Sequence, residues 1–213
     1  MKMSILLDKL RMEKKEFVTA DELKELCKLN KLNYDTVIQY FIWRKYFVRI
    51  FREVFYVRSL EEFKLGKSKY NHLELVSKGL ELKGVKRWYF GLHTALKLNN
   101  MTHEHFTTEE VISDSFFRPK PINIVGYKFR FVKISSVLLD FGIKTNNNMI
   151  MRYSDPEKTI LDFIYLYKHK GLPDERIIMD VHDWSGNISE SRLKKYSKKY
   201  PKSIAAIVDR VSK

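Results

Sequence analysis

Near the start of the chain, apolar residues recur at the three- and four-residue steps of a helix. Lysines and glutamates separate them, so one helix face is expected to be buried and the other exposed. Thr19 lies three residues before Glu22, which is the spacing of a capping box and predicts that the helix begins there. The apolar face of this helix consists of Leu23, Leu26, Cys27 and Leu29. A helix over residues 4–16 is expected to precede it.

A second helix is predicted from Tyr34 or Asp35 to about Lys45, after a turn over residues 30–33. Its inward stripe consists of Val37, Ile38, Phe41 and Ile42. Its outward positions hold hydrogen-bonding and aromatic residues where a passive helix carries lysine and glutamate, namely Thr36, Gln39, Tyr40, Trp43 and Arg44. Two helices joined by a short turn predict a helix–turn–helix, whose second helix enters the major groove of DNA.

Two strand-like stretches follow this helix. Residues 47–51 and 54–58 are rich in β-branched and aromatic residues and flank Arg52 and Glu53, so they predict a short antiparallel pair. This pair would be the wing of a winged helix–turn–helix. Tight hairpins prefer glycine or asparagine in the turn, so a short or irregular wing is expected.

The outward residues of the second helix define a candidate DNA-binding site. Gln pairs bidentately with adenine and Arg with guanine, so the residues expected to face bases are Thr36, Gln39, Tyr40 and Arg44. For the side chains of Tyr40 and Trp43, two placements stay open: against the sugar–phosphate backbone of DNA, or buried in the core. Phosphate contacts are expected from Lys31, Lys45, Arg49, Arg52 and Arg58. Asn33 and Tyr34, at the helix start, complete the candidate set.

The rest of the chain alternates between helical and strand-like periodicity. Helices are predicted over residues 69–82 and 92–98, and strands over residues 106–112, 122–125, 127–134 and 149–153. Pro156 follows a capping Ser154 or Asp155 and opens another helix. Three further helices are predicted to start near residues 174, 189 and 201.

These elements predict an α+β protein with two domains. Residues 1–65 would form the winged helix–turn–helix domain, and Gly66 would mark the boundary. Residues 66–213 would form a mixed α/β domain with a small antiparallel or mixed sheet and C-terminal helices.

The charge and composition of the chain limit the classes of partner that it is expected to bind. The chain has 213 residues and a formal net charge of +14, with a pI near 9.6, which favours a polyanionic partner such as nucleic acid. No apolar run approaches the roughly 20 residues that span a bilayer, and the N-terminus does not resemble a signal peptide. A cytoplasmic protein without membrane contact is expected. Cys27 is the single cysteine, so an intramolecular disulfide is excluded.

Catalytic groups are sparse. His103 and His105 flank Glu104, but residues two apart do not share a helix face, and no further ligand stands at a metal-binding spacing. Asp155 and Glu157 faintly resemble part of a metal-dependent nuclease site, although helix capping accounts for both. We therefore expect no enzyme activity, no bound metal and no cofactor.

Two later segments carry a family resemblance. One runs from Tyr89 to Asn99, YFGLHTALKLN, and is led by aromatic residues with Ala-Leu near its middle. The other begins at Phe141-Gly142 and continues through a strand to residues 154–162, SDPEKTILD. Together with the N-terminal pattern, their order and spacing resemble the AbiEi family of type IV antitoxins, which are predicted transcriptional regulators of viral-defence loci. The resemblance extends to about Leu166.

The resemblance implies a repressor that binds inverted repeats in its own promoter through the N-terminal domain, with a homodimer on DNA as one arrangement. The C-terminal domain would counteract a nucleotidyltransferase-like toxin encoded beside it, without forming a stable complex. Two alternatives stay open. The N-terminal domain would instead be a module for protein or RNA binding, or the protein would be a nuclease that depends on Asp155.

Overall fold

The computed structural model describes residues 2–146, 148–186 and 188–211 of an α+β chain. The chain divides into two compact units. Unit 1 comprises the residues up to Lys86 together with Ile124–Gly126, and unit 2 comprises Arg87–Asn123 and the residues from Tyr127 onward. Within the described ranges, no helix combines the length and the apolar character that crossing a membrane requires.

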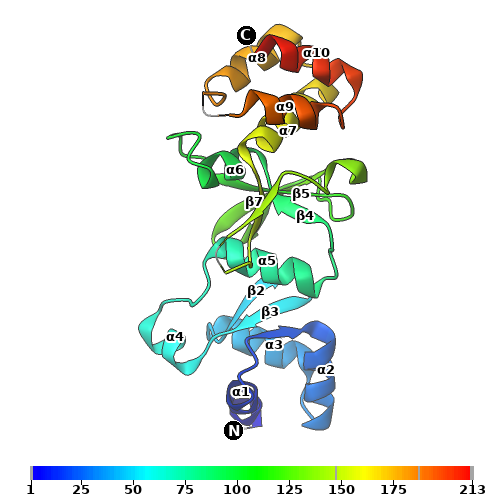
Figure 1. Ribbon diagram of the computed structural model, residues 1–213. Coiled ribbons are helices and arrows are strands. Elements are labelled where there is room, and N and C mark those ends of the chain that lie inside the picture. The colour runs from blue at the N-terminus through cyan, green and yellow to red at the C-terminus, as the bar shows by residue number, and fades with distance from the viewer. Residues whose placement is uncertain (1, 147, 187, 212–213) are drawn as a thin grey trace. The chain divides into compact units, whose positions relative to one another are not determined.

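Unit 1 surrounds a three-stranded antiparallel sheet with the strand order β1-β3-β2 (Figure 1). Its elements in chain order are α1 (Lys2–Met12), β1 (Phe17–Thr19), α2 (Ala20–Leu29), α3 (Tyr34–Trp43), β2 (Phe47–Phe51), β3 (Val54–Val57), α4 (Leu60–Leu65) and α5 (His72–Leu82).

Local sequence signals set the helix starts of unit 1. Thr19 accepts a hydrogen bond from the backbone N–H of Glu22, and the Glu22 carboxylate accepts one from the backbone N–H of Thr19. The predicted capping box is therefore confirmed. Asn33 caps α3 in the same way, because its side chain accepts the backbone N–H of Thr36 at 3.0 Å.

The core of unit 1 lies between α1, α2, α3 and the sheet. Among its fully buried side chains are Leu6, Leu10, Leu23, Val37, Phe41 and Phe55. Leu29 was expected on the buried face of α2, but 78% of it is exposed. The expectation was wrong because Leu29 lies two residues after the buried Cys27, and residues two apart do not share a helix face.

The strand pair after α3 is confirmed. β2 and β3 pair antiparallel, and the register shifts between Arg49 and Phe51. The sequence pattern did not indicate β1, a three-residue strand that pairs with β3 from Phe17↔Tyr56 to Thr19↔Val54. So short a strand has no visible periodicity of its own and forms because β3 offers it a free edge.

Unit 1 extends beyond the boundary expected after residue 65. Helix α5 packs against β2 at Gly79, where a Cβ atom would lie 2.7 Å from Ile50 Cγ2 and 2.8 Å from Phe51 Cε2. Gly79 thus allows a close approach of helix and strand that any side chain would obstruct. The close packing explains why residues 72–82 belong to unit 1 in this division.

Unit 2 is built on a six-stranded mixed sheet with the order β6-β7-β5-β4-β9-β8. β5 pairs parallel to β7 and β4 parallel to β9, whereas the β4–β5 and β8–β9 pairs are antiparallel. Its elements in chain order are β4 (Trp88–Phe90), α6 (Leu92–Leu98), β5 (Thr108–Ser113), β6 (Ile122–Ile124), β7 (Tyr127–Lys133), a 3-10 turn (Ser136–Leu138), β8 (Ile143–Thr145), β9 (Arg152–Ser154), α7 (Pro156–His169), α8 (Asp174–His182), α9 (Glu190–Ser197) and α10 (Lys202–Val211).

Helix α7 is the central helix of unit 2 and begins as predicted. Asp155 is its N-cap and accepts the backbone N–H of Lys158 at 2.8 Å, and Pro156 stands in the first turn. Ile160, Leu161 and Ile164 are fully buried in a core shared with the C-terminal helices. The expectation of a buried helix is therefore confirmed, and Figure 1 shows α7 leading from the sheet into the C-terminal helices.

Candidate nucleic-acid interface

The outward face of α3 carries a stripe of exposed side chains in unit 1. Thr36, Gln39 and Trp43 stand at steps of three and four residues and are exposed, whereas Val37 and Phe41 on the other face are fully buried. Trp43 has 73% of its surface exposed, which excludes it from the core. Large aromatic side chains are usually mostly buried, so a Trp this exposed on a helix face is unusual.

Arg44 joins the aromatic residues of this stripe. Its guanidinium carbon lies 5.3 Å from the centre of the Trp43 ring and 6.0 Å from that of Tyr40, within the range of cation–π contacts. Tyr40 itself is half-buried and packs edge-on against Tyr46 with 6.3 Å between the ring centres. The guanidinium of Arg44 thus lies within cation–π range of two aromatic rings at the end of α3.

Two of the residues expected to contact DNA at the start of α3 are hydrogen-bonded to each other. Thr36 Oγ1 donates to Asn33 Oδ1 at 3.1 Å, so these two side chains cap the helix together. Tyr34 is half-buried, with Lys24 Nζ 5.7 Å from its ring centre. Lys31 is exposed in the turn between α2 and α3 and adopts a left-handed backbone conformation with φ of 54°.

Three basic side chains of the expected phosphate set are exposed and carry no ion pair. Lys45 follows α3, Arg49 lies on β2 and Arg52 lies between β2 and β3. Among the described residues, none of the three has a carboxylate within ion-pair distance, although the Arg49 guanidinium carbon lies 5.6 Å from the Phe55 ring centre. Glu53 beside Arg52 is instead paired with Lys83 at 3.2 Å. Unpaired cations of this kind remain available to phosphate groups.

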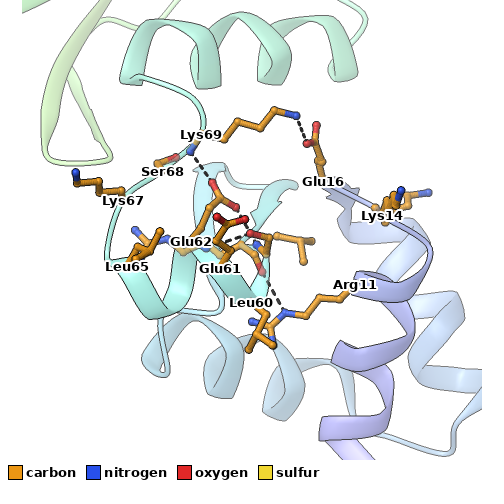
Figure 2. A pocket seen from close by; sticks show the side chains of 14 residues that line it. Arg11, Lys14, Glu16, Leu60, Glu61, Glu62, Leu65, Lys67, Ser68 and Lys69 are labelled. Atoms are coloured by element: carbon orange, nitrogen blue, oxygen red, sulfur yellow. Dashed lines mark hydrogen bonds and ion pairs between the residues drawn. The ribbon is translucent and has the colours of Figure 1, made fainter.

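Arg58 lies elsewhere in unit 1. It is half-buried after β3, where its carbonyl oxygen accepts a hydrogen bond from Arg11 Nε at 3.2 Å. Both arginines line a pocket, shown in Figure 2. The sequence analysis missed Arg11, which no local pattern distinguishes from other basic residues of α1.

The segments that carry the family resemblance meet in unit 2. Lys158 and Asp162 are fully buried and form an ion pair on α7, although sequence reasoning described this helix only as apolar. Lys158 Nζ also donates to Tyr89 Oη at 2.9 Å and to Tyr200 Oη at 2.8 Å. Both tyrosine hydroxyls donate in turn to Asp162 at 2.7 Å. All three protons of the Lys158 ammonium are thus satisfied, and we call these four residues the buried network.

Burial shifts the proton affinities of the buried network. It lowers the pKa of Lys158, although the Asp162 carboxylate opposes this shift. Burial also raises the pKa of Tyr89 and of Tyr200 well above the usual value. The Asp162 carboxylate adds to this shift, because it disfavours a second negative charge nearby. The network is almost entirely shielded from solvent, and its hydrogen bonds join α7 to β4 and to the chain between α9 and α10.

Gly142 of the second motif segment supports the buried network. Its backbone is left-handed, with φ of +64°, and a Cβ atom there would lie 2.8 Å from Lys158 Cβ and 3.0 Å from Tyr196 Cε2. Both the conformation and the lack of space require glycine.

A second polar cluster lies on β5, α6 and β7. The Glu110 carboxylate accepts hydrogen bonds from the backbone N–H of His93 at 2.9 Å and from the guanidinium of Arg130, and lies 2.9 Å from His93 Nδ1. Burial alone would raise the pKa of Glu110, but the hydrogen bond from His93 and the charge of Arg130 outweigh it and lower the pKa. Within the described ranges, no three His, Cys, Asp or Glu side chains lie close enough to hold a metal ion.

Taken together, the elements define an α+β protein with a helical unit on a small antiparallel sheet and a second unit on a mixed sheet. No protein-family model matches the chain, and a search of curated proteins finds no match. Among solved structures, the chain is similar to the Rv2827c protein of Mycobacterium tuberculosis. The TM-score is 0.61 at 11% identity, over 99% of this chain and 75% of that one. At this identity the similarity concerns the fold alone.

Proposed function

We propose that the protein is a sequence-specific DNA-binding repressor and that unit 1 contains a winged helix–turn–helix. The order helix, strand, helix, helix, strand, strand from α1 to β3 is the order of that motif. In this proposal α3 is the recognition helix, and the β2–β3 pair is the wing that approaches the phosphate backbone.

The main support for this proposal is the exposed stripe of α3. Gln39 and Arg44 have the hydrogen-bonding groups that read adenine and guanine in the major groove, and both are exposed. Trp43 would lie against the sugar–phosphate backbone. Arg49 and Arg52 would contact phosphates from the wing, because neither is neutralised by a carboxylate of the described chain.

We further propose that the protein is an AbiEi-type antitoxin. It would bind inverted repeats in its own promoter, as a homodimer in one arrangement, and counteract a nucleotidyltransferase-like toxin encoded beside it. Support comes from unit 2, where Tyr89 of the first motif segment contacts Lys158 of the second, and Gly142 of the second adjoins Lys158. Their contacts give a physical reason for the motif residues to occur together.

A mobility-shift titration with the upstream DNA of its own gene and a scrambled duplex tests the repressor proposal. At near-physiological salt, the upstream DNA should be retained preferentially. Arg49→Ala and Arg52→Ala should each weaken binding to both duplexes about equally and lower the salt slope by roughly one, whereas Gln39→Ala should reduce the preference.

Lys78→Ala is the matched control, because Lys78 is already paired with Glu81 at 3.3 Å. It should leave binding unchanged. Equal retention of both duplexes that disappears with salt would contradict operator recognition.

Trp43 and Leu29 favour a second candidate, a module that binds another protein. Both are exposed large apolar side chains in unit 1, and exposed aromatic residues are frequent anchors of protein interfaces. In that case, Trp43→Ala would abolish capture of the partner without changing DNA binding.

A further inference from the structure

A pocket in unit 1 lies beside the last turn of α1 and the chain that follows β3 (Figure 2). Its volume is about 580 Å³, within the range of small-molecule sites. Figure 2 shows Arg11 reaching in from α1, opposite the segment that carries Leu60, Glu62 and Lys69. None of these features is required by DNA recognition through α3.

Two guanidinium groups at this pocket have unused hydrogen-bond donors. Arg11 Nη2 and Arg58 Nε are buried and have no hydrogen-bond partner. A buried donor that is charged and unpaired lowers stability by more than a neutral one. Such groups are few in native proteins, and a bound ion is one of the explanations for them.

The acidic side chains of the pocket are mostly engaged by other groups. Glu62 accepts hydrogen bonds from the backbone N–H groups of Ser59 at 2.8 Å and Lys69 at 2.6 Å, and from the Tyr56 hydroxyl. Glu16 accepts from the side chains of Lys69 and Tyr70. Neither carboxylate therefore provides the acceptor that the two arginines lack.

The charge of the lining favours an anion. Six of its side chains are basic and three are acidic, and the basic residues are Arg11, Lys14, Lys15, Arg58, Lys67 and Lys69. Among the described residues, Lys14 and Lys67 make no ion pair. Apolar side chains complete the wall, and two of them, Leu60 and Leu65, are more than half exposed.

We propose that this pocket binds a small organic phosphate of mononucleotide size. The phosphate would accept hydrogen bonds from the guanidinium groups of Arg11 and Arg58, which suit the paired oxygens of such a group. Because Arg11 Nη2 and Arg58 Nε are buried, the two side chains would turn toward the ligand when it binds. The flat base or other apolar body of the ligand would lie against Leu60 and Leu65. This site is separate from the exposed stripe of α3 and does not depend on the repressor proposal.

Titration calorimetry with the whole chain tests this site. The probes are inorganic phosphate, the four 5′-ribonucleoside monophosphates and adenosine. At least one monophosphate should bind, and adenosine should not. Arg11→Met and Arg58→Met should each weaken that binding about tenfold or more, which is the effect of losing one charge-assisted hydrogen bond.

Lys64→Met is the matched control, since Lys64 is exposed on α4 but does not line the pocket. It should bind like the parent protein. Arg11→Met keeps an apolar stem over the Tyr46 ring, 5.3 Å from the Arg11 guanidinium. It removes an unpaired buried donor, which stabilises the fold, and the hydrogen bond from Nε to the Arg58 carbonyl, which destabilises it. The two effects oppose each other, so the melting temperature should change by no more than a few degrees, and a cooperative melt separates loss of binding from loss of folding.

Three results would overturn the proposal. The first is no heat from any phosphate probe up to millimolar concentration. The second is monophosphate binding that persists unchanged in both arginine variants, or adenosine binding as tight as that of the monophosphate. The third is that the two arginine variants weaken the binding of duplex DNA but not of any monophosphate. Arg11 and Arg58 would then be residues that contact the DNA backbone. The repressor proposal fails separately, through the variants of α3 and β2.

Discussion

Removal of the Lys158 ammonium should destabilise unit 2 severely. Lys158→Met retains most of the side-chain volume but deletes the cation that neutralises Asp162 in a site with no solvent access. Asp162 would keep its hydrogen bonds from Tyr89 and Tyr200, both 2.7 Å long. Its charge, however, would remain buried without a counter-ion.

The magnitude follows from the geometry. Breaking a fully buried ion pair by removing one partner costs about 3–5 kcal/mol. For a chain of this size, that corresponds to a fall in melting temperature on the order of 10 °C. Asp162→Asn keeps the side-chain shape but accepts a proton from only one of the two tyrosine hydroxyls, because its amide nitrogen is a donor. It also leaves the charge of the Lys158 ammonium without a counter-ion, so it should be destabilising as well.

Chemical denaturation of the parent, both single variants and the double variant measures the coupling. The double variant, Lys158→Met with Asp162→Asn, removes both charges, so its loss of stability should be smaller than the sum of the single losses by about 2 kcal/mol or more. Additivity within about 0.5 kcal/mol would refute the claim that the two charges neutralise each other. Since the units need not unfold together, near-UV circular dichroism should be compared with the fluorescence of single-Trp variants.

Three further outcomes are expected. Gly142→Ala should lower the free energy of unfolding by about 1–3 kcal/mol, measured against Gly171→Ala, which shares the left-handed conformation in unit 2 but has open space around its Cβ. The lowered pKa of Glu110 means that its stabilisation is present above pH 4.5 and is lost as the pH falls through the folded-state value. Glu110→Gln should thus flatten the acid limb of a pH-stability curve, and an unchanged limb would contradict this. Arg52→Ala should lower the salt slope of DNA binding in the mobility-shift assay, and an unchanged slope would remove Arg52 from the phosphate set.

Local signals in the sequence determined where several elements begin. Thr19 with Glu22, and Asp155 with Pro156, satisfy the first backbone N–H groups of their helices within a few residues. No distant part of the chain is needed for such a cap, so the sequence is sufficient. The pair of strands after α3 was equally visible, because its apolar and β-branched residues are adjacent in the chain.

Short strands depended on tertiary structure. β4 and β8 have three residues each, and β4 is held between β5 and β9 through pairs such as Phe90↔Tyr153. The partner of β8 is β9, the next strand in the chain, whereas the partners of β4 lie farther along it. In both cases three residues are too few to show a periodicity in the sequence. The same holds for β1, whose partner β3 lies beyond two helices.

The polar sites were decided by tertiary structure as well. Lys158 and Asp162 are four residues apart on a helix, a spacing that usually means an exposed salt bridge. Only the packing of Tyr89 and Tyr200 over α7 excludes water and makes the pair a buried one. The exposed stripe of α3 followed from helical periodicity, whereas the meeting of Arg11 with Arg58 joins residues 47 positions apart and required the folded chain.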